Sequence, residues 1–89
     1  MEHNLLYLVN EKLREYSKLV IYYSDGNNKV ALKPIEHHRP SLESFTKNII
    51  DAMNTIEKFT TYKVRTFKYD YQNRHHATAI IIVDEPEAK

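Results

Sequence analysis

Residues 41–59 carry the pattern that most constrains the fold of this chain. The large apolar side chains of this segment are Leu42, Phe45, Ile49, Ile50, Met53, Ile56 and Phe59. Their spacing, mostly three or four residues, places them on one side of an α-helix. Ser41 is a suitable N-cap, and Pro40 disfavours helical backbone in the residue before it. The sequence therefore predicts a helix at 41–59 whose apolar side is buried against other elements.

A second apolar stripe predicts a shorter helix at residues 4–17. The stripe consists of Leu5, Val9, Leu13 and Tyr16, which are spaced by four, four and three residues. Asn4 has a side-chain oxygen that suits the N-cap position, because it can accept a hydrogen bond from a free backbone N–H. Two helices of this kind need a common apolar surface to cover.

Each predicted helix is followed by residues typical of a β-hairpin. Segments 18–24 and 29–35 flank the turn sequence of residues 25–28, where Gly26 and its Asn neighbours tolerate positive φ. Alternation predicts that one face of this hairpin lies in the core: Leu19, Ile21, Tyr23, Val30 and Leu32. Pro34 has no N–H to donate, so the second strand ends there or lies at an edge.

Segments 61–71 and 76–84 predict a second hairpin that turns at residues 72–75. Pairing Tyr71 with His76 places Lys63 opposite Asp84. One face then carries Phe67, Tyr69, Tyr71, Ile80 and Ile82, and the other carries Tyr62, Val64, Thr66, Lys68, Ala79, Ile81 and Val83. Because residues 79–83 are apolar on both faces, we expect this strand to be central in its sheet.

These elements predict an α+β fold, a two-layer sandwich with the order α-β-β-α-β-β. Its simplest form is a four-stranded antiparallel sheet with both helices on one face. A chain of 89 residues is expected to form a single domain over 1–89, with a frayed tail at 85–89.

Composition excludes several classes of protein. The chain has no cysteine, which excludes disulfides, thiolate zinc sites and cysteine nucleophiles and fits a reducing compartment. Gly26 is the single glycine, so phosphate-cradling glycine loops are excluded. A net charge of +1 excludes an acidic DNA mimic and a histone-like protein. Since no signal peptide or membrane-spanning stretch is present, we expect a soluble cytoplasmic protein with no membrane partner.

The histidines and serines predict neither a metal site nor catalysis. His37 and His38 are adjacent, as are His75 and His76, and adjacent strand residues point in opposite directions. Each pair therefore offers one ligand to a shared site, and we interpret these histidines as solvated. The serines occupy turn, strand-end or cap positions. We expect no cofactor and no enzymatic activity, unless a cleft between two subunits builds a site.

The uncovered face of the sheet is the predicted functional surface. Its predicted interface residues are Val20, Tyr22, Tyr62, Val64, Ile81 and Val83. A contiguous apolar patch of this kind marks an interaction site, and the seven tyrosines of the chain suit one. Either one helix crosses to this face or a second copy covers it, and we favour a homodimer. The sequence therefore favours a small non-enzymatic protein-interaction module: a dimeric regulator, adaptor or inhibitor of a partner protein.

Residues 61–76 support an alternative, nucleic-acid binding by the last hairpin. The candidate contacts are Lys63, Arg65, Lys68, Arg74, His75 and His76, interleaved with aromatic rings on which bases stack. If Phe67, Tyr69 and Tyr71 share a face with Ile80 and Ile82, most of these rings belong to the core. The surviving candidates are then Arg74, His75 and His76 at the turn, with Lys68 and Tyr62 on the uncovered face.

Overall fold

The computed structural model describes residues 2–25 and 28–84. The elements are α1 (Glu2–Ser17), β1 (Leu19–Asp25), β2 (Lys29–Pro34), α2 (Leu42–Phe59), β3 (Lys63–Asn73) and β4 (His76–Asp84). This order confirms the predicted α+β class. The predicted tail at 85–89 and the turn residues Gly26 and Asn27 lie outside the described residues.

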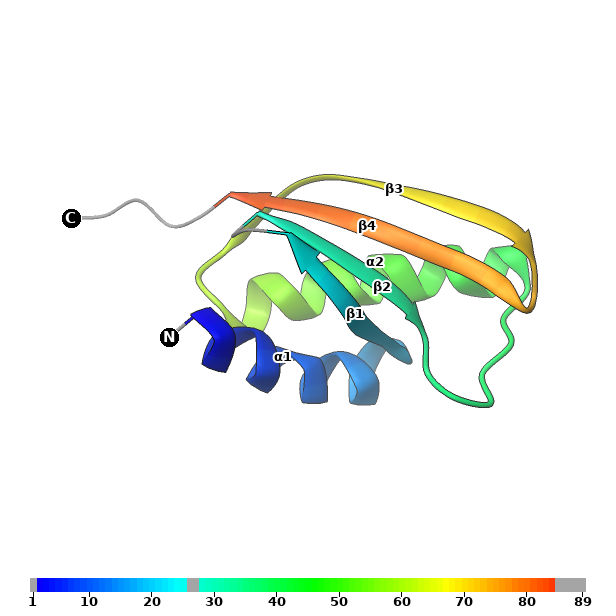
Figure 1. The fold of residues 1–89 in the computed structure, drawn as a ribbon, viewed down its shortest axis with the longest axis horizontal. Helices are drawn as coiled ribbons and strands as arrows, with labels where there is room; N and C mark the ends of the chain where they lie inside the picture. The colour runs from blue at the N-terminus through cyan, green and yellow to red at the C-terminus, as the bar shows by residue number, and fades with distance from the viewer. Residues whose placement is uncertain (1, 26–27, 85–89) are drawn as a thin grey trace.

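The four strands form one antiparallel sheet in the order β1-β2-β4-β3, and both helices pack on the same side of it (Figure 1). Strands β2 and β4 are central, which confirms the prediction for residues 79–83. The side of the sheet away from the helices is here called the open face. It includes Val20, Tyr22, Tyr23, Asp25, Lys29, Ala31, Lys33, Thr66, Lys68, Asp70, Thr78, Ile80, Ile82 and Asp84.

Helix α2 begins as predicted, because Ser41 Oγ accepts a hydrogen bond from the Ser44 N–H at 3.2 Å. Its buried side is narrower than the predicted stripe. Phe45, Ala52, Thr55 and two isoleucines, Ile49 and Ile56, are buried. Leu42, Ile50 and Phe59 remain exposed at the flanks of the helix. The sheet and α1 together cover only one sector of α2.

Helix α1 begins at Glu2, so Asn4 lies inside the helix and its predicted N-cap role is wrong. Val9 and Leu13 are buried as predicted, whereas Tyr16 is exposed and stacks on Phe59 with 5.8 Å between ring centroids. The helix ends at Ser17, and the next residue, Lys18, has a left-handed φ of 60° that turns the chain into β1.

A bulge in β1 corrects the predicted face of the first hairpin. Ile21 pairs with Leu32 but Tyr23 pairs with Ala31, so Tyr22 is an extra residue in β1. Leu19, Val30 and Leu32 are buried, and Ile21 packs against them, as predicted. Tyr23 is 59% exposed and lies on the open face instead of in the core, because the bulge reverses the alternation after Ile21.

The predicted pairing of Tyr71 with His76 is also wrong. Tyr71 pairs with Ala77 and Asn73 pairs with His76, which leaves Gln72 as an extra residue. A shift of one residue reverses which side of β4 shares a face with the β3 aromatic rings. Four alternate residues of β4 therefore face the helices and are buried: Ala77, Ala79, Ile81 and Val83. Ile80 and Ile82 lie on the open face.

A contact with α2 and its preceding loop explains this register. The Tyr71 ring lies 5.9 Å from the Phe45 ring, and the Tyr71 hydroxyl donates a hydrogen bond to the Pro40 carbonyl at 2.9 Å. A second bulge, at Arg65, restores the predicted pairing of Lys63 with Asp84. The two extra residues account for the lengths of the strands, 11 residues in β3 and 9 in β4.

Candidate functional site

The open face carries an apolar band that crosses the sheet. Strand register places Tyr23, Ala31, Ile80 and Lys68 in one row, with Lys29, Ile82 and Thr66 in the next. Ala31 is only 6% exposed although no helix covers this face, because larger side chains flank it. Ile80 and Ile82 are half-buried. The band therefore presents accessible apolar area on the two central strands.

Two tyrosines extend this band at the β1 edge. Tyr22 and Tyr23 are 49% and 59% exposed, and Lys33 Nζ lies 5.7 Å from the centroid of the Tyr22 ring. Tyrosine combines a large apolar ring with a hydroxyl that hydrogen-bonds to a partner or to water. Such side chains are enriched at protein interfaces.

Some cations of the open face have an acidic residue beside them. Asp25 lies opposite Lys29 in the β1–β2 register. Asp84 Oδ1 lies 2.7 Å from Arg65 Nη2 and binds that guanidinium. A surface that binds a polyanion concentrates cations that no nearby carboxylate neutralises, because the affinity comes from contacts between cations and phosphates. This mixture of charges instead suits the surface of another protein.

Four of the six predicted interface residues lie on the other side of the sheet or within the core. Ile81 is 0% exposed, Val83 3% and Tyr62 8%, and Val64 packs against the buried cluster. The bulges are the reason, since they reverse the alternation on which the prediction depended. Val20 and Tyr22 lie on the open face as predicted.

Sequence reasoning missed three open-face residues, Tyr23, Ile80 and Ile82. One signal pointed to the two isoleucines. Residues 79–83 are apolar without alternation, so one of the two β4 faces had to present apolar side chains away from the helices. The sequence did not show which one.

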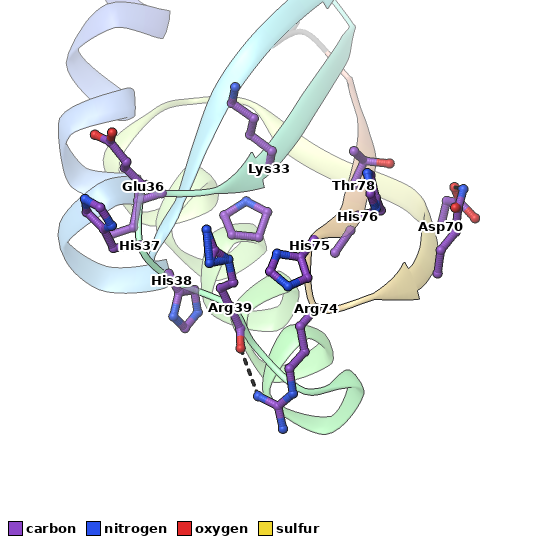
Figure 2. A pocket seen from close by; sticks show the side chains of 14 residues that line it. Lys33, Glu36, His37, His38, Arg39, Asp70, Arg74, His75, His76 and Thr78 are labelled. Atoms are coloured by element: carbon purple, nitrogen blue, oxygen red, sulfur yellow. Dashed lines mark hydrogen bonds between the residues drawn. The ribbon is translucent and has the colours of Figure 1, made fainter.

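A second site is a cleft of about 450 Å³ at the end of the sheet. It is lined by residues 33–39, Asp70, Gln72 and residues 74–78, and it is called here the basic cleft. Figure 2 shows Lys33, Arg39, Arg74 and His75 around it, with Glu36 and Asp70 toward opposite sides. Two turns that are far apart in sequence thus meet at one place.

Hydrogen bonds hold the two sides of the basic cleft together. Arg74 Nη1 donates to the Arg39 carbonyl at 3.0 Å, which joins the β3–β4 turn to the loop before α2. His38 N–H donates to the Ile35 carbonyl at 3.1 Å, and His38 Nε2 lies 2.9 Å from Asn48 Oδ1. His37, the residue before His38, has a left-handed φ of 71°. The loop is therefore fixed to both α2 and the second hairpin.

The basic cleft brings together three of the predicted nucleic-acid contacts, Arg74, His75 and His76. The other three do not line it: Lys63 lies opposite Asp84 in the β3–β4 register, Arg65 binds the Asp84 carboxylate, and Lys68 lies on the open face. Within residues 2–25 and 28–84, no group of three or more His, Asp or Glu side chains is arranged to hold a metal ion.

Comparisons of the chain with protein-family models, with curated protein sequences and with solved structures give no match. Neither helix, within the described residues, has the length and apolar character needed to cross a bilayer.

Proposed function

We propose that this chain is a non-enzymatic protein-interaction module, a cytoplasmic regulator, adaptor or inhibitor that docks a partner protein on the open face. The observation that carries the proposal is the apolar band of Ile80 and Ile82 extended by Tyr22 and Tyr23. Exposed apolar patches with a polar surround are typical of interaction surfaces.

The rigidity of the surface supports docking. The isoleucines of the band lie on β4, which is hydrogen-bonded to a neighbouring strand on each side. Ile81, between them, is fully buried against the helices. A surface held in this way loses little conformational entropy on binding, so more of the contact energy remains as affinity.

Photo-crosslinking followed by a binding measurement tests the proposal. A photoreactive phenylalanine analogue at position 23 captures partners, and the captured protein is then purified for titration calorimetry. We expect the double variant Tyr23→Ser, Ile80→Thr to weaken binding by at least about tenfold, the loss typical of central interface residues.

The matched control is Tyr16→Ser, since Tyr16 is 51% exposed and lies on α1, away from the open face. It should bind like the unmodified chain. Equal affinity of the double variant and the control for the purified partner would contradict docking on the open face.

A second candidate function, nucleic-acid binding, is favoured by one observation. Lys33, Arg39 and Arg74 line the basic cleft together with His75 and His76. Guanidinium groups bind phosphate oxygens in bidentate geometry.

Fluorescence anisotropy with labelled single- and double-stranded oligonucleotides tests this candidate. Binding should weaken steeply between about 50 and 200 mM salt, and the double variant Arg39→Ala, Arg74→Ala should lower both the affinity and the salt dependence. Arg14→Ala, on α1, is the control. If neither oligonucleotide binds at low salt, the basic cleft is not a nucleic-acid site.

A further inference from the structure

Strand β3 has a long unpaired edge. It is 11 residues long and pairs with β4 on one side only. Among the described residues, one hydrogen bond reaches the backbone of this outer edge: the Val64 N–H donates to Glu57 Oε2 at 2.8 Å. An edge of this length presents a row of backbone donors and acceptors that another strand can pair with.

Apolar side chains lie beside this edge on the helix side of the sheet. Phe67 and Tyr69 are 40% and 47% exposed, and the Tyr69 ring contacts Phe45 of α2 at 6.3 Å. Ile50 is 52% exposed and lies seven residues before Glu57. Seven residues are close to two helical turns, so Ile50 shares the side of α2 that faces β3. A strand added at this edge would cover these side chains.

The sequence of β3 is complementary to itself about Tyr69. Residues 67–71 read Phe-Lys-Tyr-Asp-Tyr, with a cation and an anion at equal distances from the central ring. In an antiparallel pair centred on Tyr69, Lys68 lies opposite Asp70 of the second copy, and this happens twice. Opposite charges in directly facing positions stabilise a strand pair. Centring on Lys68 or Asp70 would instead place like charges opposite each other.

We propose that two copies of this chain pair antiparallel along β3, centred on Tyr69, and form one continuous sheet with four strands from each copy. The two-fold axis is perpendicular to the sheet, as an interface between identical copies with facing strands requires. Both open faces then lie on the same side of the joined sheet. This dimer uses the strand edge and not the open face, so it does not depend on the proposed function.

Charge reversal tests the pairing, because both residues are exposed and their replacement leaves the core unchanged. Asp70→Lys places lysines opposite each other and should raise the dimer dissociation constant at least tenfold in sedimentation equilibrium. The double variant Lys68→Asp, Asp70→Lys restores opposite charges and should return the constant to within about threefold of the unmodified chain.

The matched control is Asp25→Lys, which makes the same change of charge on the other edge strand and should leave the dimer unchanged. Backbone amides of residues 66–72 should also exchange more slowly with deuterium as protein concentration rises. A monomeric unmodified chain at about 200 μM, or a double variant that fails to recover, would overturn the proposal. Loss of the dimer in Tyr23→Ser, Ile80→Thr alone would place the interface on the open face and overturn it as well.

Discussion

The two edge strands of the sheet are closed to different extents. β1 has 7 residues, and its Ile21 N–H donates to Asn10 Oδ1 of α1 at 2.8 Å. β3 has 11 residues and, in the described part of the chain, its outer backbone edge hydrogen-bonds to one side chain, that of Glu57, near its N-terminal end. Short length and a covering helix protect an edge from pairing with another chain. This chain therefore closes one edge of its sheet with its own helix and leaves most of the other edge open.

Within residues 2–25 and 28–84, the three bulges all lie in these edge strands, at Tyr22, Arg65 and Gln72. An extra residue in an edge strand disturbs one ladder of hydrogen bonds, whereas in a central strand it would disturb two. The central strands β2 and β4 therefore keep a regular register with each other. The bulges in the edge strands therefore determine which of their side chains point toward the helices.

The largest expected effect on stability comes from replacing Phe45, which packs beneath the β3 edge. Phe45 is 0% exposed and contacts the rings of Tyr69 and Tyr71. Phe45→Ala should lower the free energy of unfolding by about 3–5 kcal/mol, because it leaves a cavity in the core. Urea denaturation measures the change. Ile50→Ala, on the exposed flank of α2, is the control, and a loss of equal size there would contradict the different roles of the two positions.

A substitution of Ser17 tests how much the connection between α1 and β1 contributes to stability. Its hydroxyl is fully buried, donates to the Leu13 carbonyl at 2.7 Å and accepts from the Leu19 N–H at 3.2 Å. Ser17→Ala leaves a buried donor without this acceptor and should cost about 1–3 kcal/mol of unfolding free energy. Ser44→Ala, at an exposed position of α2, should change stability far less. The interpretation fails if the two variants unfold at the same urea concentration.

Asn10 tests the closure of the β1 edge directly. Asn10→Ala removes the acceptor for the Ile21 N–H and should cost about 1 kcal/mol, the typical contribution of one such hydrogen bond. The Ile21 amide should also exchange faster with deuterium. Asn10→Asp keeps an acceptor and should retain slow exchange. Unchanged exchange in the alanine variant would show that α1 closes this edge without Asn10.

The smallest expected effect concerns the ion pair at the start of β3. The side chains of Arg65 and Asp84 are 66% and 47% exposed, so solvent screens their attraction. Arg65→Ala should change the unfolding free energy by less than about 1 kcal/mol, and the difference should decrease further in high salt. A loss comparable to that of Ser17→Ala would contradict this prediction.

Local patterns in the sequence were sufficient for the elements and for the central position of β4. Helical spacing predicted α2, and the unbroken apolar run at 79–83 predicted a strand with neighbours on both sides. The register was not predictable in this way. It depends on the hydrogen bond of Tyr71 to Pro40, 31 positions away, and bulges at Arg65 and Gln72 have no local signature. The error in register placed Ile81 and Val83 on the wrong face.

The composition of the basic cleft was also not predictable from local sequence patterns, because it depends on contacts between residues far apart in the chain. Two short runs of His and Arg were visible in the sequence, at 37–39 and 74–76. Their meeting depends on the Arg74 contact with the Arg39 carbonyl, which joins residues 35 positions apart. Residue types alone predicted candidates for binding but not which of them the fold brings together.

At the Arg65 bulge, the fold depends on the number of residues in β3 more than on the identity of the side chain at position 65. Replacing the side chain alters one exposed ion pair. Deleting the residue would shorten the strand by one step, while Tyr71 remains held by its contacts with Pro40 and Phe45. Val64 and Tyr62 would then rotate out of the core, and Lys63 would rotate in. We infer that natural variants of this chain tolerate many residues at position 65 but not the loss of the position itself.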